Sequence, residues 1–336
     1  MRGWARRRRG RGFEYLDERG RTITDPSELE RIRSLAIPPA WGDVWICPHP
    51  RGHLQAVGTD AAGRRQYRYH DAWRERRDRE KHERMQAFAE QLASLRAQVD
   101  RDLATRGLSR ERVLAGAVRM LDRASFRVGG ESYAERHGSY GLATLRKRHV
   151  HVAGDTITFD YRGKSGVRQV QRVQDPELAP LIHSLKRRSG GGHELLAWKE
   201  DRRWRDVRSA DINEYLKEHA GPEASAKDFR TWHATVLAAV LLAVQEAEAT
   251  SATSRRRQVV AVIRDVATYL GNTPAVCRAS YVDPRVIDRF MAGETIGARL
   301  ADVDPERPDG IAAQRSLERA VLALLDGSTA PRREAA

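Results

Sequence analysis

The spacing of apolar and polar residues divides the chain into a strand-rich first part and a helix-rich second part. Up to about residue 70, short apolar segments alternate with Gly, Pro and Asp, a pattern typical of antiparallel strands joined by short loops. From residue 71 onward, apolar residues recur at helical spacing over long segments. The pattern therefore predicts an α+β protein, with a small N-terminal antiparallel β domain before a mainly α-helical domain.

The predicted strands of the first part cover residues 13–15, 21–23, 44–47, 54–57 and 66–70, and a short helix begins after Asp25. In the last strand, Gln66, Arg68 and His70 alternate with Tyr67 and Tyr69, so the phenols and the polar groups lie on opposite faces. Two interpretations of these tyrosines stay open. They pack against the domain, or they contact a nucleic acid beside the arginines.

Helical spacing predicts a long, charged helix over 71–101, whose first half links the domains and places their boundary near Glu80. Strands over 148–152, 156–161 and 167–173 form a predicted meander, with a tight turn at 162–166. The other predicted helices cover residues 110–124, 133–137, 176–188, 210–219, 228–249, 253–270, 284–291 and 311–325. We therefore assign residues 13–80 to the β domain, 81–326 to the helical domain and 327–336 to a polar tail.

One helix break, at residues 271–274, precedes a candidate nucleophile. Gly271 ends the predicted helix, and Pro274 suits the first turn of the next one because its φ is fixed and it lacks an N–H. Tyr281 lies about two turns beyond Pro274, after three polar or small residues. Its phenol is either an ordinary packing or surface group, or a nucleophile outside the core.

The charge of the chain favours a polyanionic partner. Lys and Arg number 60 against 46 Asp and Glu, which gives a net charge of +14. An Arg excess is typical of nucleic-acid binders because the guanidinium matches phosphate geometry, although an Arg-rich protein without such a partner has the same composition. Residues 1–12 lack the apolar segment of a signal peptide, and we predict a flexible basic arm there.

Neither a cofactor nor a membrane anchor is indicated. Cys47 and Cys277 have no metal-ligand spacing, and the sequence contains no P-loop and no acidic metal cluster, so we predict no metal or nucleotide cofactor. No run of eighteen apolar residues occurs, and no spanning helix is predicted. We expect a cytoplasmic protein in a reducing environment.

Three basic residues stand in contexts suited to chemistry. Arg127 follows a predicted helix and precedes glycines, where the backbone can turn sharply. Arg230 lies near the start of the longest apolar helix, where unpaired N–H groups favour an anion. Lys164 lies on the tight turn of the meander, and neighbouring arginines would make its ammonium a readier proton donor. For each residue, an ordinary surface or salt-bridge role is the alternative.

Taken together, these motifs resemble the type IB DNA topoisomerases of the compact, poxvirus-like bacterial class. The segments that carry the resemblance are 37–41, 53–60 and 63–70 in the β domain, and 126–129, 138–145, 163–164, 227–231 and 271–281 in the helical domain. They follow one another in the family's order between residues 12 and 291. The resemblance implies a monomer whose two domains form a clamp around duplex DNA, without metal or ATP, associated with the bacterial nucleoid.

The resemblance also implies roles for individual residues. Tyr281 is expected to attack a phosphodiester and form a 3′-phosphotyrosyl intermediate. Arg127 and Arg230 match the arginines that neutralise the phosphate, and Lys164 matches the lysine that protonates the leaving 5′-oxygen. Asn272 stands where relatives usually carry His, and its amide donates a hydrogen bond but carries no charge. The expected DNA contacts are Arg64, Gln66, Tyr67, Arg68, Tyr69, Arg146 and Lys147.

Two other functions share parts of this pattern. A site-specific tyrosine recombinase uses the same chemistry but predicts a helical N-terminal domain and a second basic or His residue after Arg230. His233 fits that position, although we interpret it as a packing residue. A non-catalytic DNA-binding protein of the same fold would have no need for Arg127, Lys164 and Tyr281 together.

Overall fold

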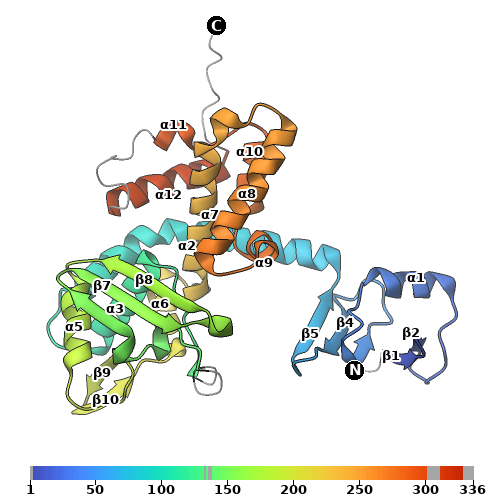
Figure 1. Cartoon of the computed structure of the whole chain (residues 1–336), viewed down its shortest axis with the longest axis horizontal. Coiled ribbons are helices and arrows are strands. Elements are labelled where there is room, and N and C mark those ends of the chain that lie inside the picture. Colours follow the sequence, from blue (N-terminus) through green and yellow to red (C-terminus); the bar gives the residue numbers. More distant parts are fainter. Residues whose placement is uncertain (1–2, 132–133, 135–137, 301–310, 328–336) are drawn as a thin grey trace, which may run out of the picture. The chain divides into compact units, whose positions relative to one another are not determined.

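The computed structural model describes residues 3–131, 134, 138–300 and 311–327. The chain divides into two compact units, Met1–Glu83 and Arg84–Ala336, close to the boundary predicted near Glu80 (Figure 1). The helix predicted over 133–137 and the tail beyond residue 327 lie outside the described residues, apart from Ala134, which is helical.

The first unit is a five-stranded antiparallel sheet with strand order β2-β1-β3-β4-β5. Its elements are β1 (Trp4–Arg9), β2 (Gly12–Leu16), α1 (Pro26–Ser34), β3 (Gly42–Ile46), β4 (Leu54–Thr59), β5 (Arg65–Tyr69) and the first part of α2 (Asp71–Leu103). Ile32 of α1 packs with Val44, Ile46 and Ala56 of the sheet to form a small core. The predicted strand at 21–23 is reduced to a single bridge between Leu16 and Thr22.

The basic arm predicted for residues 1–12 is wrong, because residues 4–9 form β1 inside the sheet. This strand pairs with β2 and with β3. The Arg6 guanidinium donates to the carbonyls of Ile37, Pro38 and Trp41 and lies 4.2 Å from the centre of the Phe13 ring. The run of arginines predicted a solvated segment, but carbonyl oxygens and an aromatic ring of the protein take the place of water around Arg6. The charge pattern alone therefore did not predict the strand.

The second unit combines a helical bundle with a three-stranded sheet of order β6-β7-β8 (Figure 1). Its strands are β6 (Val150–Ala153), β7 (Thr156–Arg162), β8 (Arg168–Gln174), β9 (Ala197–Glu200) and β10 (Arg203–Asp206). Its helices are the rest of α2, α3 (Arg110–Arg123), α5 (Leu178–Arg187), α6 (Ser209–Ala220), α7 (Ala226–Val244), α8 (Ala252–Leu270), α9 (Pro274–Ser280), α10 (Pro284–Met291), α11 (Gly297–Leu300) and α12 (Ile311–Leu325). The predicted fold class is confirmed.

Helix α7 lies at the centre of the second unit and packs against α3, α8, α10 and α12. Its Phe229 and Trp232 side chains are fully buried. A buried ion network joins three other helices nearby: Arg96 of α2 donates at 2.7 Å to Asp122 of α3 and at 2.6 Å to Glu318 of α12. Because each charge is paired and hydrogen-bonded, the network fixes how these helices meet around α7.

The break between α8 and α9 is confirmed where the sequence predicts it. Gly271 ends α8 in the left-handed region, with φ of 60°, and the following backbone N–H of Asn272 returns to the Ala267 carbonyl at 2.9 Å. Thr273 caps α9, whose first residue is Pro274. This tight connection fixes Asn272 close to the helix that ends at Tyr281.

Candidate active site

The loop that carries Arg127 is held by a close approach of two glycines. A Cβ on Gly129, whose φ is 85°, would lie 2.8 Å from the Gly141 Cα, so neither position has room for a side chain. The Arg127 carbonyl accepts from the Leu142 N–H at 2.9 Å, and Phe126 is fully buried beside it. Gly129 and Gly141 therefore hold this loop in place, and the Arg127 guanidinium extends out of the core.

The Arg127 guanidinium reaches the break between α8 and α9. It donates to the Gly271 carbonyl at 2.8 Å and to Asn272 Oδ1 at 2.9 Å. The Asn272 Nδ2 is buried and has no hydrogen-bond partner among the described residues. With its oxygen engaged by Arg127, the amide keeps its donor free, which suits the proposed replacement of a histidine donor.

Arg230 is buried one turn into α7 and is held from two directions. Its guanidinium donates to the Ser125 carbonyl, and its second terminal nitrogen donates to the Leu270 carbonyl at 2.7 Å. At the start of α7, the buried Asp228 carboxylate accepts from the Ser225 N–H at 2.8 Å and caps that end of the helix. The role of Arg230 toward an anion stays a prediction.

The phenol of Tyr281, at the end of α9, faces this cationic group. The Arg230 Cζ lies 5.5 Å from the centre of the Tyr281 ring, and the Lys227 Nζ lies 5.8 Å from it. Burial is the largest single influence on the pKa of Tyr281 and raises it. The charge of Arg230, a hydrogen bond from Arg230 and the charges of Arg127 and Lys227 all lower it, and together they hold the Tyr281 pKa below its usual value. A phenol of lowered pKa is a better nucleophile near neutral pH.

Lys164 shares a pocket with both arginines. It begins a short turn, Lys164–Gly166, between β7 and β8, and its side chain is exposed. The pocket is lined by Arg127, Lys164, Arg230, the β7 and β8 residues beside them, and Gly271 of the helix break. Residues from four segments far apart in sequence thus meet at one place.

Sequence reasoning missed Lys227 and Gln169 at this site. Lys227 lies three residues before Arg230, on the same face of α7, so helical spacing alone could have drawn attention to it. Gln169 of β8 lines the pocket, but its strand position gave no signal before the sheet was known. His233 does not line this pocket. Burial lowers the pKa of His233, and its two ring nitrogens are enclosed, as expected of a packing residue.

The predicted DNA contacts of the first unit are Arg64, just before β5, and four residues of β5. Tyr69 stacks on Trp73 with ring centres 4.4 Å apart, and the more exposed Tyr67 stacks on Tyr69 at 6.1 Å. Tyr67 therefore ends an aromatic row with a ring that is free to meet a ligand.

The polar residues beside this row are only partly free. Arg64 and Gln66 both donate to the Asp60 carboxylate at 2.9 Å, and Arg68 donates to the Ala36 carbonyl at 2.8 Å. The Arg64 side chain nevertheless stays mostly exposed, so it retains donors for a phosphate.

Arg146 and Lys147 differ in the contacts that their side chains make within the protein. Arg146 lies 5.3 Å from the centre of the Tyr140 ring and lines a polar pocket together with Trp204. The Lys147 Nζ donates to the Arg188 carbonyl at 3.3 Å. Burial, followed by the charge of Arg188, lowers the pKa of Lys147. Tyr140 also lines the pocket shared by Arg127, Lys164 and Arg230, so Arg146 lies beside that pocket.

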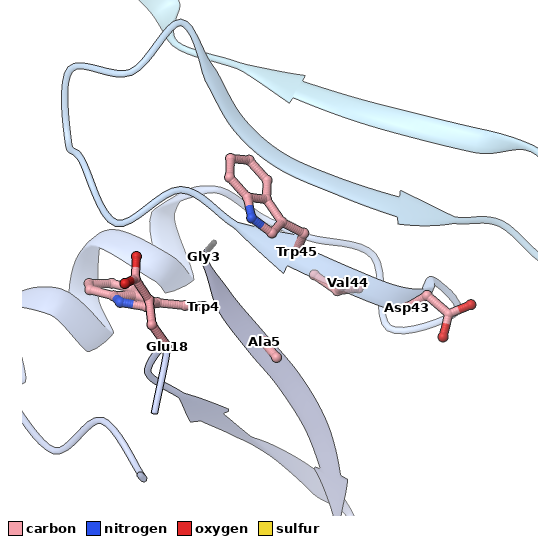
Figure 2. Close-up of a pocket in the computed structure, with 7 residues that line it drawn as sticks. All are labelled: Gly3, Trp4, Ala5, Glu18, Asp43, Val44 and Trp45. Carbon is pink, nitrogen blue, oxygen red and sulfur yellow. The ribbon is translucent and has the colours of Figure 1, made fainter. Parts of the chain in front are cut away.

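A further pocket in the first unit contains none of the predicted site residues (Figure 2). It lies between β1 and β3 and is walled by Trp4 and Trp45, with Glu18 and Asp43 at its edges. Gly3 is required there because a Cβ would lie 2.0 Å from the Trp45 indole nitrogen.

Among the described residues, no group of three or more His, Cys, Asp or Glu side chains is arranged to hold a metal ion. No helix in the described part has the length and apolarity needed to cross a bilayer.

A β domain joined to a helical domain with a small internal sheet is typical of type IB enzymes that act on DNA. Residues 70–292 match the family model for the catalytic core of eukaryotic DNA topoisomerase I, and residues 12–60 match the model for the N-terminal domain of bacterial DNA topoisomerase IB. The chain belongs to the type IB DNA topoisomerase family.

Individual relatives agree with this assignment. The chain is 31% identical over 275 residues to DNA topoisomerase 1B of Acanthamoeba polyphaga mimivirus, a match that covers 80% of this chain and 81% of the viral protein. DNA topoisomerase 1 beta of Arabidopsis thaliana is 26% identical over 49% of this chain, and DNA topoisomerase 1 of Daucus carota is 27% identical over 47%. These matches span only 17% and 19% of the plant proteins. The family predicted from the sequence is therefore confirmed. The five-stranded sheet of the first unit also argues against a tyrosine recombinase, for which a helical N-terminal domain is expected.

Proposed function

We propose that this protein relaxes supercoiled duplex DNA by cutting and resealing one strand through Tyr281, without ATP or metal. The observation that carries the proposal is the position of the Tyr281 phenol against Arg230, within the group that also contains Arg127 and Asn272. The purified protein is expected to relax positively and negatively supercoiled plasmid in EDTA without nucleotide. Failure to relax either sign would contradict the proposal.

In the cleavage step, the Tyr281 phenol gives its proton to solvent, and the phenolate oxygen attacks the phosphorus of a DNA phosphodiester. A bond forms between that oxygen and phosphorus, the bond from phosphorus to the 5′-oxygen breaks, and Lys164 gives its proton to the departing oxygen. Arg127 and Arg230 lie fixed before the reaction, so they stabilise the charge that grows on the non-bridging oxygens at little reorganisation cost. The products are a 3′-phosphotyrosyl enzyme and a free 5′-hydroxyl.

Resealing is the reverse of this step. The 5′-hydroxyl attacks the phosphotyrosine, Lys164 takes back the proton, and Tyr281 leaves as the phenolate, which regains its proton from solvent. Because the phosphodiester energy is kept in the covalent link, the cycle needs no nucleotide hydrolysis. Rotation of the free 5′ end before resealing removes supercoils of either sign.

Asn272 is proposed to donate its free Nδ2 hydrogen to a non-bridging oxygen. A neutral His can accept from Arg127 with one ring nitrogen and donate with the other, so Asn272→His is expected to keep cleavage within about tenfold of wild type, or ~1.4 kcal/mol of barrier. Single-turnover cleavage of a radiolabelled duplex measures this. Total loss of cleavage would show that the site does not accept the two side chains interchangeably.

We also propose that a monomer binds duplex DNA as a clamp in the bacterial cytoplasm, associated with the nucleoid. The proposed contacts are Arg64, Gln66, Tyr67, Arg68, Tyr69, Arg146 and Lys147. The net charge of +14 supports extensive phosphate contact. If six to ten phosphates are neutralised, affinity is expected to fall about 10³- to 10⁵-fold between 50 and 200 mM salt. Binding titrations with Tyr281→Phe, which excludes covalent capture, measure the slope. A flat response to salt would rule out the clamp.

A further inference from the structure

Gln169 is a polar residue of the pocket that contains Arg127, Lys164 and Arg230, and the proposed mechanism gives it no role. It pairs directly with Tyr161 across β7 and β8, so the two side chains share one face of the sheet. That face is turned toward the pocket, because Tyr161 and Gln169 both line it. The opposite face carries Arg168, which donates to Asp160 at 2.8 Å.

The Gln169 side chain lies between two glycines, and one of them, Gly163, makes room for it. A Cβ on Gly163 would lie 2.8 Å from Gln169 Cγ, closer than real contacts allow. A Cβ on Gly271 would lie 3.7 Å from Gln169 Nε2. The side chain therefore crosses the turn that carries Lys164, and its amide ends beside the helix break that carries Asn272.

The Gln169 amide has no hydrogen-bond partner within the described part of the chain. Gln171, on the same face of β8, differs because its Nε2 donates to the Tyr161 hydroxyl at 3.2 Å. The residues that line the pocket include Arg127, Lys164 and Arg230 but no carboxylate. An unused amide donor among three cations is suited to an anion that the protein itself does not supply, and a phosphate has oxygens enough for all of them.

We propose that Gln169 donates its amide hydrogen to a non-bridging oxygen of the scissile phosphate, beside Arg127 and Arg230. This inference rests on the proposed function. Gln169 and Asn272 would then supply two neutral donors, one from β8 and one from the break between α8 and α9. A neutral donor adds to the stabilisation of the phosphate without adding repulsion to a site already crowded with positive charge.

Three variants test the proposal by single-turnover cleavage. Gln169→Met keeps the length and packing of the side chain but removes the donor, and Gln169→Glu replaces the donor with a negative charge. Gln174→Glu is the matched control, because Gln174 is an exposed residue on the other face of the same strand. DNA affinity is measured separately with each change combined with Tyr281→Phe, and thermal melting checks the fold.

Gln169→Met is expected to slow cleavage about 10- to 100-fold, with affinity for DNA changed less than about threefold. Gln169→Glu is expected to slow cleavage at least about 100-fold, and Gln174→Glu is expected to cleave like wild type. Because Gln169→Glu keeps the shape of the native side chain, its cleavage rate tests the role of Gln169 if Gln169→Met is unstable.

Wild-type cleavage by a stable Gln169→Met, or by Gln169→Glu, would overturn the role of Gln169. Plasmid relaxation by wild type and Tyr281→Phe, run in parallel, reports on the proposed function separately. An inactive wild type, or an active Tyr281→Phe, contradicts that function whatever the Gln169 variants do.

Discussion

Replacing Tyr281 with Phe is expected to abolish relaxation of supercoiled plasmid while leaving DNA binding intact. The change removes the attacking oxygen but keeps the ring that packs near Arg230 and Lys227. We expect a loss of at least about 10⁴-fold, because no covalent intermediate can form without the nucleophile. Relaxation is measured over a range of enzyme concentrations, and binding to a short duplex is measured alongside.

Tyr269→Phe is the matched control for this experiment. Tyr269 is a half-exposed tyrosine of α8 near the end of the same helix that leads to the break at Gly271. Removing the Tyr269 hydroxyl by this change is expected to leave relaxation of the plasmid unchanged. Normal relaxation by Tyr281→Phe would show that another group is the nucleophile.

Lys164→Ala is expected to have the second-largest effect, with single-turnover cleavage slowed about 10²- to 10⁴-fold. The departing 5′-oxygen is strongly basic and needs a proton, whereas a sulfur in the same bridging position leaves as a stable thiolate. A duplex with a 5′-bridging sulfur at the cleavage site is therefore expected to restore most of the lost rate. The variant should fold normally because the Lys164 side chain is exposed.

Lys217→Ala, at an exposed position of α6, is the control for the loss of one positive charge and is expected to cleave both substrates normally. If the sulfur substrate leaves Lys164→Ala as slow as the oxygen substrate does, Lys164 is not the proton donor. Such a result would leave it the role of a phosphate contact.

The parts of the fold that the sequence predicted well are those specified by local chemistry. The break between α8 and α9 needs only Gly271, a Thr cap and Pro274, each of which acts within one turn of its own position. The meander of β6, β7 and β8 was likewise readable from alternation and turns.

Two elements were missed because their determinants are not local. The arginine-rich strand β1 is stabilised by carbonyls of residues 37 to 41, which accept hydrogen bonds from the Arg6 guanidinium. The hairpin of β9 and β10 turns through Asp201 and Arg202, with φ of 45° and 66°, where Gly or Asn would normally signal the turn. Neither feature can be inferred from the residues nearby in the sequence.

The candidate site also combines residues that local motifs predict with a residue that only the three-dimensional structure reveals. Arg127, Arg230 and Tyr281 each stand in a recognisable motif, and the structure brings them together around the end of α8. The proposed contribution of Gln169 depends on the register of β7 with β8 and on the absence of a Cβ at Gly163. Such a contact appears only when distant segments are placed in three dimensions.

The most direct measurement is the identity of the covalent adduct. Protein trapped on a nicked duplex that cannot reseal is digested with protease and nuclease, and the modified peptide is sequenced by mass spectrometry. We expect a nucleotide attached through its 3′-phosphate to Tyr281, with a 5′-hydroxyl on the released strand. Attachment at another residue, or through a 5′-phosphate, would contradict the mechanism.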